Sequence, residues 1–248
     1  MAMCLWAFLP LNAQITEEIF ESFKLQERRN VKYYIPDNYN PEHAYPLVVV
    51  LDSEYLFDQV VAASKFHSRF QGMPETLVVG IGQMERDLRW EDCAFEERSG
   101  LPAEKGKQFF EFIGLEVIPF MVSRYNVAPF KMFVGYDITA NFGNYYLFKE
   151  RSIFSAFISI SPHLAPEMDN RIPTRIAAME QPIFYHLIME GKTKEVDPYI
   201  NALDTSMKQI DREGFSYYFD RYDQADELTV ATYGINTAWD RTFEIFKP

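Results

Sequence analysis

Short apolar runs rich in β-branched residues recur along the chain and predict the strands of a sheet. The runs at 47–51 and 77–81 are apolar on both faces, as central strands covered on both sides are. An antiparallel pair is predicted at 20–25 and 31–35, before the turn-forming Pro36-Asp37-Asn38. Further strands are predicted at 131–134, 156–160, 183–189 and 215–221.

Helical periodicity occupies the intervals between these runs. The aromatic and aliphatic residues of 109–118 recur at helical spacing, and Pro119 predicts a kink there rather than an end. The other predicted helices are 138–149, 198–212 and 236–246. Alternation of strands and helices predicts an α/β fold, with a mostly parallel central sheet flanked by helices and an antiparallel N-terminal lead-in. Because no repeat or linker interrupts the pattern, 15–248 is predicted to be a single domain.

Composition and charge exclude several classes of protein. Of the 248 residues, 48% are hydrophobic and 16% aromatic, which is not the composition of a disordered chain. The 24 Lys and Arg stand against 36 Asp and Glu, a net charge of −12, and no basic run occurs, so nucleic acid is not an expected partner. No apolar stretch reaches about 18 residues, so the sequence predicts no membrane span.

The first fourteen residues differ from the rest of the chain. An apolar run from 4 to 11 precedes Asn12-Ala13-Gln14, which resembles a small-residue cleavage site. We therefore predict that 1–14 is the remnant of a signal peptide and that the protein is periplasmic or secreted. The positive charge that normally opens a signal peptide is missing before Lys24. The alternative is an apolar segment docked on a cytoplasmic protein.

The segment 131–141 is the principal candidate for chemistry, because there an apolar strand runs directly into a helix. In α/β sheets, ligands bind at the carboxyl ends of the strands. This is the place of the nucleophile elbow, G-x-S-x-G, which holds a serine on a strained turn. Here Gly135 occupies the first glycine position, Asp137 the serine position and Thr139 the second glycine position.

Five further segments, in order, resemble the enterochelin-esterase-like branch of the α/β-hydrolases over roughly 20 to 246. They are a "YxPxxY" opening at 34–39, a "P-hydrophobic-LDG" strand at 46–53, a "VGI…RxxD" segment at 79–82 with Arg86-Asp87, an "IPxxxxxY" helix end at 118–125, and an "SPS"-like Ser161-Pro162-His163. The resemblance implies the fold of a carboxylic-ester hydrolase, with a Ser, Asp or Glu, and His triad in that chain order.

The same resemblance implies that the triad is degenerate. The family's histidine lies in a "DHxSV"-like stretch, which here reads 226–230 and places Glu227 at the histidine position. No histidine follows His186. The orienting acid should follow the strand 183–189, which makes Glu190 the nearest candidate, before Glu195 and Asp197.

The resemblance also implies which residues line the former active-site cleft. Its oxyanion hole would use a backbone N–H of Ser53 or Glu54 and that of Ile138. The Glu54 carboxylate would either lie near that hole or point into solvent. The other candidate binding residues are Tyr136 and His163, with Tyr55, Trp90 and Phe95 as further aromatic residues around the entrance.

These observations predict a non-catalytic protein that binds a small molecule or a protein in the former cleft. The first alternative is an active esterase that uses Asp137 or a relocated base, and the second is a structural protein whose cleft is filled. No metal or cofactor is predicted, because CxxC, HExxH, P-loop and GxGxxG motifs are lacking. We also expect a positive φ at Asp137, and carboxyl groups of Asp137 and Glu227 that face one another. Their repulsion would be relieved by a proton, by a cation, or by an intruding Arg or Lys.

Overall fold

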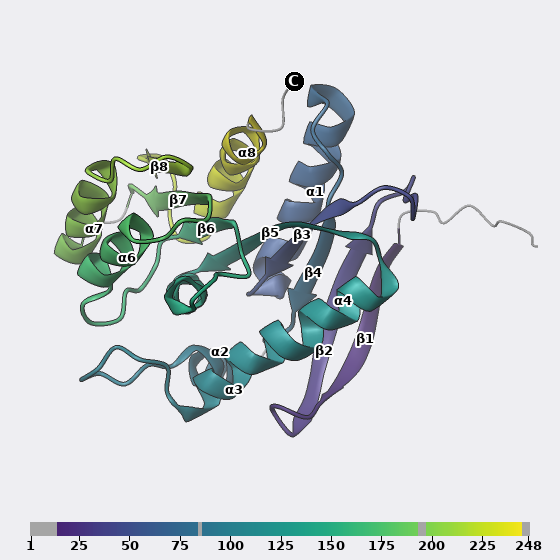
Figure 1. The fold of residues 1–248 in the computed structure, drawn as a ribbon, viewed down its shortest axis with the longest axis horizontal. Coiled ribbons are helices and arrows are strands. Elements are labelled where there is room, and N and C mark those ends of the chain that lie inside the picture. Colours follow the sequence, from purple (N-terminus) through teal and green to yellow (C-terminus); the bar gives the residue numbers. More distant parts are fainter. Residues whose placement is uncertain (1–13, 84–85, 193–196, 245–248) are drawn as a thin grey trace, which may run out of the picture.

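A computed structural model describes residues 14–83, 86–192 and 197–244. Within them an eight-stranded sheet has the order β1-β2-β4-β3-β5-β6-β7-β8 (Figure 1). The strands are β1 Gln14–Ser22, β2 Glu27–Ile35, β3 Tyr45–Val50, β4 Leu77–Ile81, β5 Val127–Tyr136, β6 Ala156–Ile160, β7 Ile183–Glu190 and β8 Phe215–Tyr222.

The directions of the strands confirm the predicted fold class. β1 pairs antiparallel with β2, and β2 antiparallel with β4, while every later pair from β3 to β8 is parallel. The first strand lies earlier than the predicted 20–25, because a turn begins after Ser22. The Ser22 hydroxyl accepts a hydrogen bond from the Leu25 N–H (2.9 Å), and Gln26 has a left-handed φ of 56°, so the chain reverses there.

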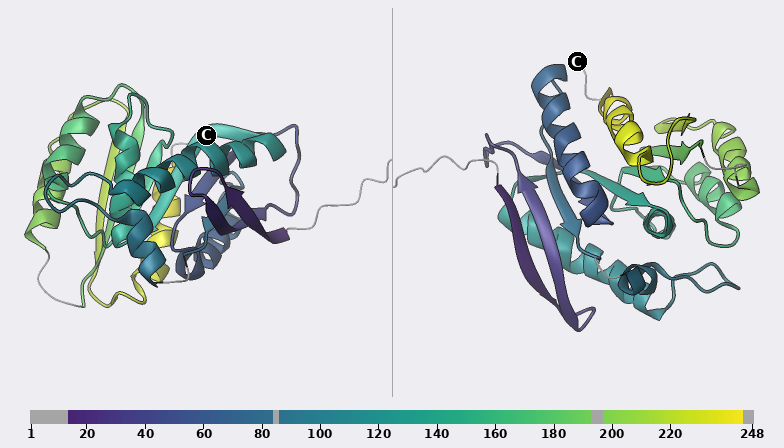
Figure 2. Two further views of the ribbon diagram at one scale, coloured as in Figure 1. Left: turned by 90° about the horizontal axis from the view of Figure 1, so that it is seen from below. Right: turned by 180° about the vertical axis from the view of Figure 1, so that it is seen from behind.

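Helices cover both faces of the sheet (Figure 2). α1 (Ser53–Gln71) and α8 (Val230–Phe243) pack on one face, against the even-numbered side chains of β3 such as Val48 and Val50. The other face meets Leu47 and Val49. It is covered by α3 Glu104–Phe112, α4 Ile118–Arg124, α5 Ile138–Gly143, α6 Met168–Ala177 and α7 Pro198–Lys208.

The helix predictions are confirmed in position and corrected in extent. α3 and α4 are joined by a π-helical turn, Ile113–Val117, so the helix continues through Pro119 and its irregularity precedes the proline. The last helix begins at Val230 rather than at 236. α1, α2 (Arg86–Cys93) and α6 were not predicted.

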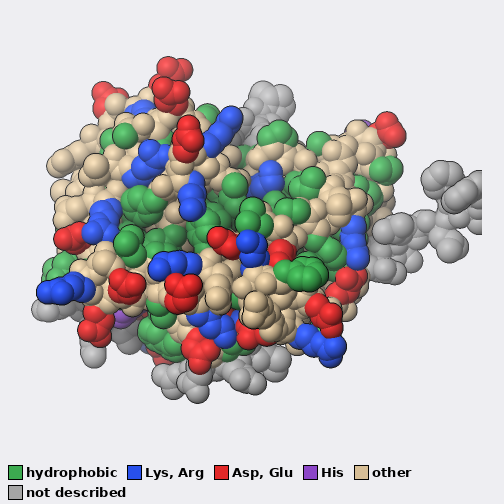
Figure 3. Space-filling model, turned by 60° about the horizontal axis from the view of Figure 1, so that its bottom comes forward, with side chains coloured by type: hydrophobic (Ala, Val, Ile, Leu, Met, Phe, Trp, Pro, Cys, Tyr) green, Lys and Arg blue, Asp and Glu red, His purple; other side chains and the backbone are tan. Residues whose placement is uncertain are grey.

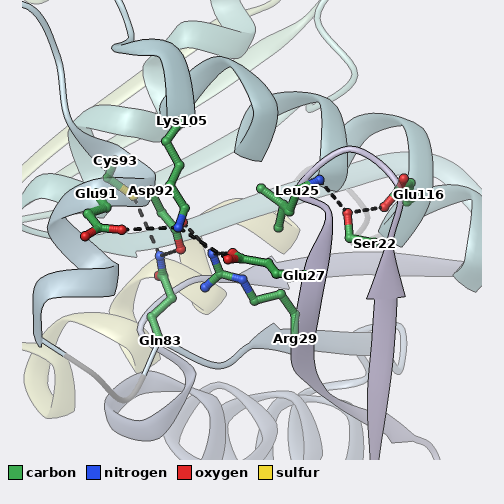
Figure 4. A network of polar contacts seen from close by, with 10 residues as sticks. All are labelled: Ser22, Leu25, Glu27, Arg29, Gln83, Glu91, Asp92, Cys93, Lys105 and Glu116. Carbon is green, nitrogen blue, oxygen red and sulfur yellow. Dashed lines mark hydrogen bonds and ion pairs between the residues drawn. The ribbon is translucent and has the colours of Figure 1, made fainter.

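Helix α2 is fixed to the sheet by buried ions (Figure 4). The Arg29 guanidinium on β2 lies 2.6 Å from the Asp92 carboxylate on α2, and both side chains are almost fully buried. Gln83 Nε2 donates to the other oxygen of Asp92 (2.9 Å). Glu27 also accepts from Arg29, and Lys105 reaches Glu27 from α3 (3.4 Å).

Among the described residues, no helix is long and apolar enough to cross a membrane. The predicted signal segment 1–14 falls, apart from Gln14 at the start of β1, outside the described residues.

Candidate functional site

A strained turn joins β5 to α5. Asp137 has φ 55° and ψ −120°, a conformation that costs of order 1–3 kcal/mol for a residue with a side chain. Its N–H donates to the Ile160 carbonyl (2.9 Å), and its carbonyl accepts from the N–H groups of Asn141 (3.2 Å) and His163 (3.1 Å). The predicted positive φ and the strand-turn-helix geometry of this segment are confirmed.

The neighbouring strands end in the same way. Asp52 follows β3 with φ 52°, and Ser161 follows β6 with φ 42°. β3, β5 and β6 are adjacent in the sheet, so three strained residues lie side by side at its carboxyl edge. Such residues concentrate at functional sites, where the surrounding structure holds them in place.

Arg89 on α2 connects two of these strand ends. Its Nε lies 2.5 Å from Asp52 Oδ1 and its Nη1 lies 3.0 Å from Asp137 Oδ2. Its Nη2 also donates to the Tyr136 carbonyl (2.8 Å). One guanidinium therefore binds both carboxylates and the backbone just before the elbow.

Thr139 completes this cluster. Its hydroxyl lies 2.7 Å from Asp52 Oδ2 and accepts from the Tyr136 N–H (2.9 Å), and the side chain is fully buried. A Cβ at Gly135 would lie 2.8 Å from the Thr139 carbonyl, so the close approach of strand and helix depends on the first glycine position. The side chain at position 139, where the elbow pattern has a second glycine, bonds to Asp52.

The ionic state of the cluster follows from burial and charge. Burial raises the pKa of Asp52, and the bonds from Arg89 and Thr139 only partly oppose it. Burial lowers the pKa of Arg89, but the Asp52 and Asp137 carboxylates outweigh it and the net shift is upward. Arg89 is therefore a permanent cation at the position that faces the elbow.

Glu227 does not take part in this cluster. Its side chain is exposed, and its backbone carbonyl accepts from the Tyr55 hydroxyl (3.1 Å). Tyr55 packs edge-on against Tyr136 (5.5 Å between ring centroids). Within the described residues no hydrogen bond joins Asp137 to Glu227. An arginine does bind the Asp137 carboxylate, but it joins it to Asp52 rather than standing between Asp137 and Glu227 as predicted.

Tyr136 lies among the predicted acids. Burial raises its pKa, and the charges of Glu190, Asp137 and Glu227 raise it further. Glu190 ends β7, at the position predicted for the orienting acid, where it accepts a short hydrogen bond from the Ser161 hydroxyl. Of the other acid candidates, Asp197 caps α7 by accepting from the Tyr199 N–H (2.9 Å), and Glu195 lies outside the described residues.

The remaining candidates lie on either side of the elbow. Ser53 is buried in the first turn of α1. Glu54 is exposed, as in the second of its two predicted orientations, and its carboxylate accepts from the Gln83 N–H (3.0 Å) in the loop after β4. The exposed His163 ring stacks on Phe95 and meets Trp90 edge-on, each 6.0 Å between centroids.

A hollow of about 670 Å³ lies beside the elbow. Ile138 lines it at the elbow itself, and its aromatic lining residues are Trp90, Phe95, His163 and Tyr199. Three of its lining residues are acidic, namely Glu97, Glu167 and Asp169. Among the described residues, no group of three or more His, Cys, Asp or Glu could hold a metal ion.

Sequence reasoning missed Arg89, the ionic role of Asp52 and the contribution of Tyr199. The "RxxD" resemblance falls on Arg86, which begins α2, whereas Arg89 lies about one turn further along that helix. Asp52 was visible as part of the "LDG"-like segment, but its carboxylate was not assigned a role.

The strand-turn-helix geometry at Asp137 agrees with the protein family that the sequence matches. The sequence matches the model described as "Putative esterase" over residues 22–241. The chain belongs to this family. A comparison with curated protein sequences gives no match.

Solved structures resemble this member of the esterase family over nearly its whole length. An uncharacterised protein from Capnocytophaga ochracea is 28% identical, with a TM-score of 0.86 over 95% of this chain; the chain spans only 65% of that protein. An IroE-like serine hydrolase from Shewanella oneidensis is 19% identical, with a TM-score of 0.78, covering 95% of this chain and 82% of that one. The siderophore hydrolase EstA from Aspergillus nidulans is 13% identical, with a TM-score of 0.68, covering 98% and 100%. The Shewanella and Aspergillus proteins share the fold of this chain.

Proposed function

We propose that this esterase-family protein has no hydrolytic turnover and binds a small aromatic molecule, neutral or cationic, in the hollow beside the elbow. The observation that carries the proposal is the contact of Arg89 with both Asp52 and Asp137. A serine nucleophile needs a histidine at hydrogen-bond distance, and this position instead holds a carboxylate bound to a guanidinium.

Asp137 is a poor nucleophile in this setting. A carboxylate can attack a substrate and form an ester intermediate, but a group that activates water must then release the product. Arg89 occupies one oxygen of Asp137 and stabilises its negative charge. Glu227, at the histidine position, is exposed. The His163 ring is stacked on Phe95 and meets Trp90 edge-on.

The lining of the hollow supports the class of ligand. Aromatic faces bind planar rings by stacking, and they attract cations through the negative charge of their π systems. The acids Glu97 and Asp169 disfavour an anion there, whereas the charge of Glu167 is paired with Arg171. Two structural neighbours are described as siderophore hydrolases, and we propose binding without the hydrolytic step for this chain.

The first test is turnover. We expect the wild type to hydrolyse 4-nitrophenyl acetate and butyrate no faster than Asp137→Ala or buffer. The double variant Asp137→Ser with Glu227→His should stay inactive, because triad members act as a unit and Arg89 would still occupy the site. Turnover that disappears in Asp137→Ala would overturn the proposal in favour of an active esterase.

The second test is binding. Trp90 lines the hollow and is 39% exposed, whereas Trp239 is only 1% exposed. A ligand in the hollow should therefore quench the fluorescence of Trp90. We expect quenching by benzyltrimethylammonium, weaker quenching by benzoate, and loss of the difference in Trp90→Phe. Equal responses to the two probes would contradict the proposed ligand class.

A further inference from the structure

A second hollow, of about 490 Å³, lies outside the elbow, between α3, α6 and the 3₁₀ turn Asn144–Phe148 that follows α5. Its size is within the range of about 300–1,000 Å³ that small-molecule sites occupy. It shares no lining residue with the hollow beside the elbow.

The segment around Gly100 separates the two hollows. Gly100 has φ 64°, and a Cβ there would lie 2.5 Å from the Pro166 carbonyl oxygen, so these two backbones touch. Tyr145 donates its hydroxyl proton to the Gly100 carbonyl (2.8 Å), and Arg171 donates to the Ser99 carbonyl (2.7 Å). The two hollows are neighbours on α6, where Arg171 of the second is paired with Glu167 of the first.

Apolar side chains form most of the second hollow, and two of them remain largely exposed. Leu101 is 52% exposed and Phe148 is 38% exposed. The other apolar lining residues are Pro102, Phe110, Tyr145 and Met168. Apolar side chains gather in the middle of the molecular face shown in Figure 3, with charged groups of both signs around them.

The charges at this hollow are the reverse of those of the whole protein. The chain carries a net charge of −12, but three of the four charged lining residues, Lys107, Lys149 and Arg171, are cations. The single acid, Glu111, is paired with Lys24 (2.8 Å). Arg171 is in turn paired with Glu167, so the local positive charge beside the apolar surface comes from Lys107 and Lys149.

Lys149 and Lys107 are the cations best placed to bind an anion. Lys149 Nζ lies 4.8 Å from the centre of the Phe110 ring, and within the described residues no carboxylate pairs with it. Lys107 precedes Phe110 by about one turn of α3, so the two share a helix face. Its ion pair with Glu104 (3.5 Å) is exposed to solvent and therefore weak, so Lys107 remains available to another anion.

From this arrangement we infer that the hollow binds a carboxylate with an apolar body of medium length. The carboxylate lies between Lys149 and Lys107, and the apolar body covers Phe110, Phe148 and Met168. The site is independent of the function proposed for the elbow, because neither its residues nor its preferred charge is shared with that hollow.

The experiment is calorimetric titration of the whole protein with decanoate below its micellar concentration. Decanoate should bind the wild type, and Lys149→Glu should weaken that binding about tenfold or more, because a repulsive charge replaces a charge-assisted bond. Lys65→Glu is the matched control, since Lys65 also lies over a ring, 5.0 Å from Tyr34, and its variant should bind like the wild type. Leu101→Asp, at an exposed position, should weaken binding as well.

Three outcomes would overturn the inference: no binding of decanoate by the wild type, equal binding by Lys149→Glu, or equal binding of decyltrimethylammonium. Saturating decanoate should leave the response to benzyltrimethylammonium unchanged, which shows that the two hollows are separate. Competition between the two probes would instead place decanoate at the elbow and refute the second site.

Discussion

Helix α2 carries two ion clusters of the same chemistry in different surroundings. At Asp92 the guanidinium of Arg29 is 2% exposed and its partner carboxylate is fully buried. At Arg89 the guanidinium side chain is 17% exposed, and its partners Asp52 and Asp137 are 9% and 29% exposed. The first cluster is sealed in the interior, whereas the second is partly open to water.

The two clusters also differ in how completely their polar atoms are paired. Nε and Nη1 of Arg29 have no hydrogen-bond partner among the described residues, although the guanidinium lies over the Phe109 ring (5.7 Å). Arg89 donates to four oxygens. Removal of one partner of a buried ion pair leaves the other charge buried and uncompensated. Substitutions in the Arg29–Asp92 cluster should therefore destabilise the fold more than substitutions in the Arg89 cluster.

The largest expected effect is at the buried cluster. Arg29→Met should lower the free energy of unfolding by about 3–5 kcal/mol, because the Asp92 carboxylate would remain buried without its cation. Urea denaturation measures this, with Arg28→Met as the matched control. Arg28 is 72% exposed and paired with Glu21 at 2.7 Å, so its loss should cost about 0–1 kcal/mol. Adding Asp92→Leu to Arg29→Met should restore much of the stability. Equal losses in Arg29→Met and Arg28→Met would contradict the assignment of this stability to the buried pair.

The elbow cluster should respond less and in a pH-dependent way. Arg89→Met should cost about 1–3 kcal/mol near neutral pH, because Asp52 loses its ionic partner. Burial already raises the pKa of Asp52 above 3.8, and loss of Arg89 would raise it further. A raised folded-state pKa gives stability that is present below the ordinary value and lost as pH rises. The deficit relative to the wild type should therefore shrink as pH falls toward 4. A deficit that does not change with pH would contradict this account.

A third ionic group, on the opposite face, should show the smallest effect. His186 is fully buried on β7, with Nε2 2.8 Å from Asp220, which Arg241 also binds (2.7 Å). Burial lowers the pKa of His186 below 6.5, and Arg241 adds to this, although Asp220 opposes it. The unfolded chain then takes up a proton before the folded protein does, so stability falls as pH drops below 6.5. We expect this fall in urea titrations of the wild type and of the exposed-site control His43→Gln. His186→Gln should lack part of it, and an unchanged profile in that variant would assign the acid sensitivity elsewhere.

The central part of the sheet could be predicted because its strands are apolar on both faces. The predicted limits of β4 and β6 agree with the structure, and the other parallel strands are displaced by a few residues at most. α1 carried a usable signal, since Leu56, Val60, Ala63 and His67 are buried at helical spacing. α2 carried little, because its sequence RDLRWEDC is mostly polar and its conformation depends on ion pairs with residues far along the chain.

The backbone conformation of the candidate site could be predicted from the sequence, but the ion pairs of its side chains could not. A strand that runs into a helix at Gly135 fixes the strained turn at Asp137, whatever the side chain. The partner of Asp137 could not be found in the same way. Arg89 is 48 residues away, and at least two other arginines of the same stretch, Arg86 and Arg98, were equally available to sequence reasoning.

Because Arg89 and Asp92 lie about one turn apart on the same short helix, the buried ion pair also determines how the open one behaves. α2 cannot shift toward or away from the cleft without separating Asp92 from Arg29 in an apolar interior. Arg89 is therefore held on a backbone whose position is already set. A site built in this way loses little conformational entropy when it is occupied, and its selectivity comes from shape and charge that are in place before a ligand arrives.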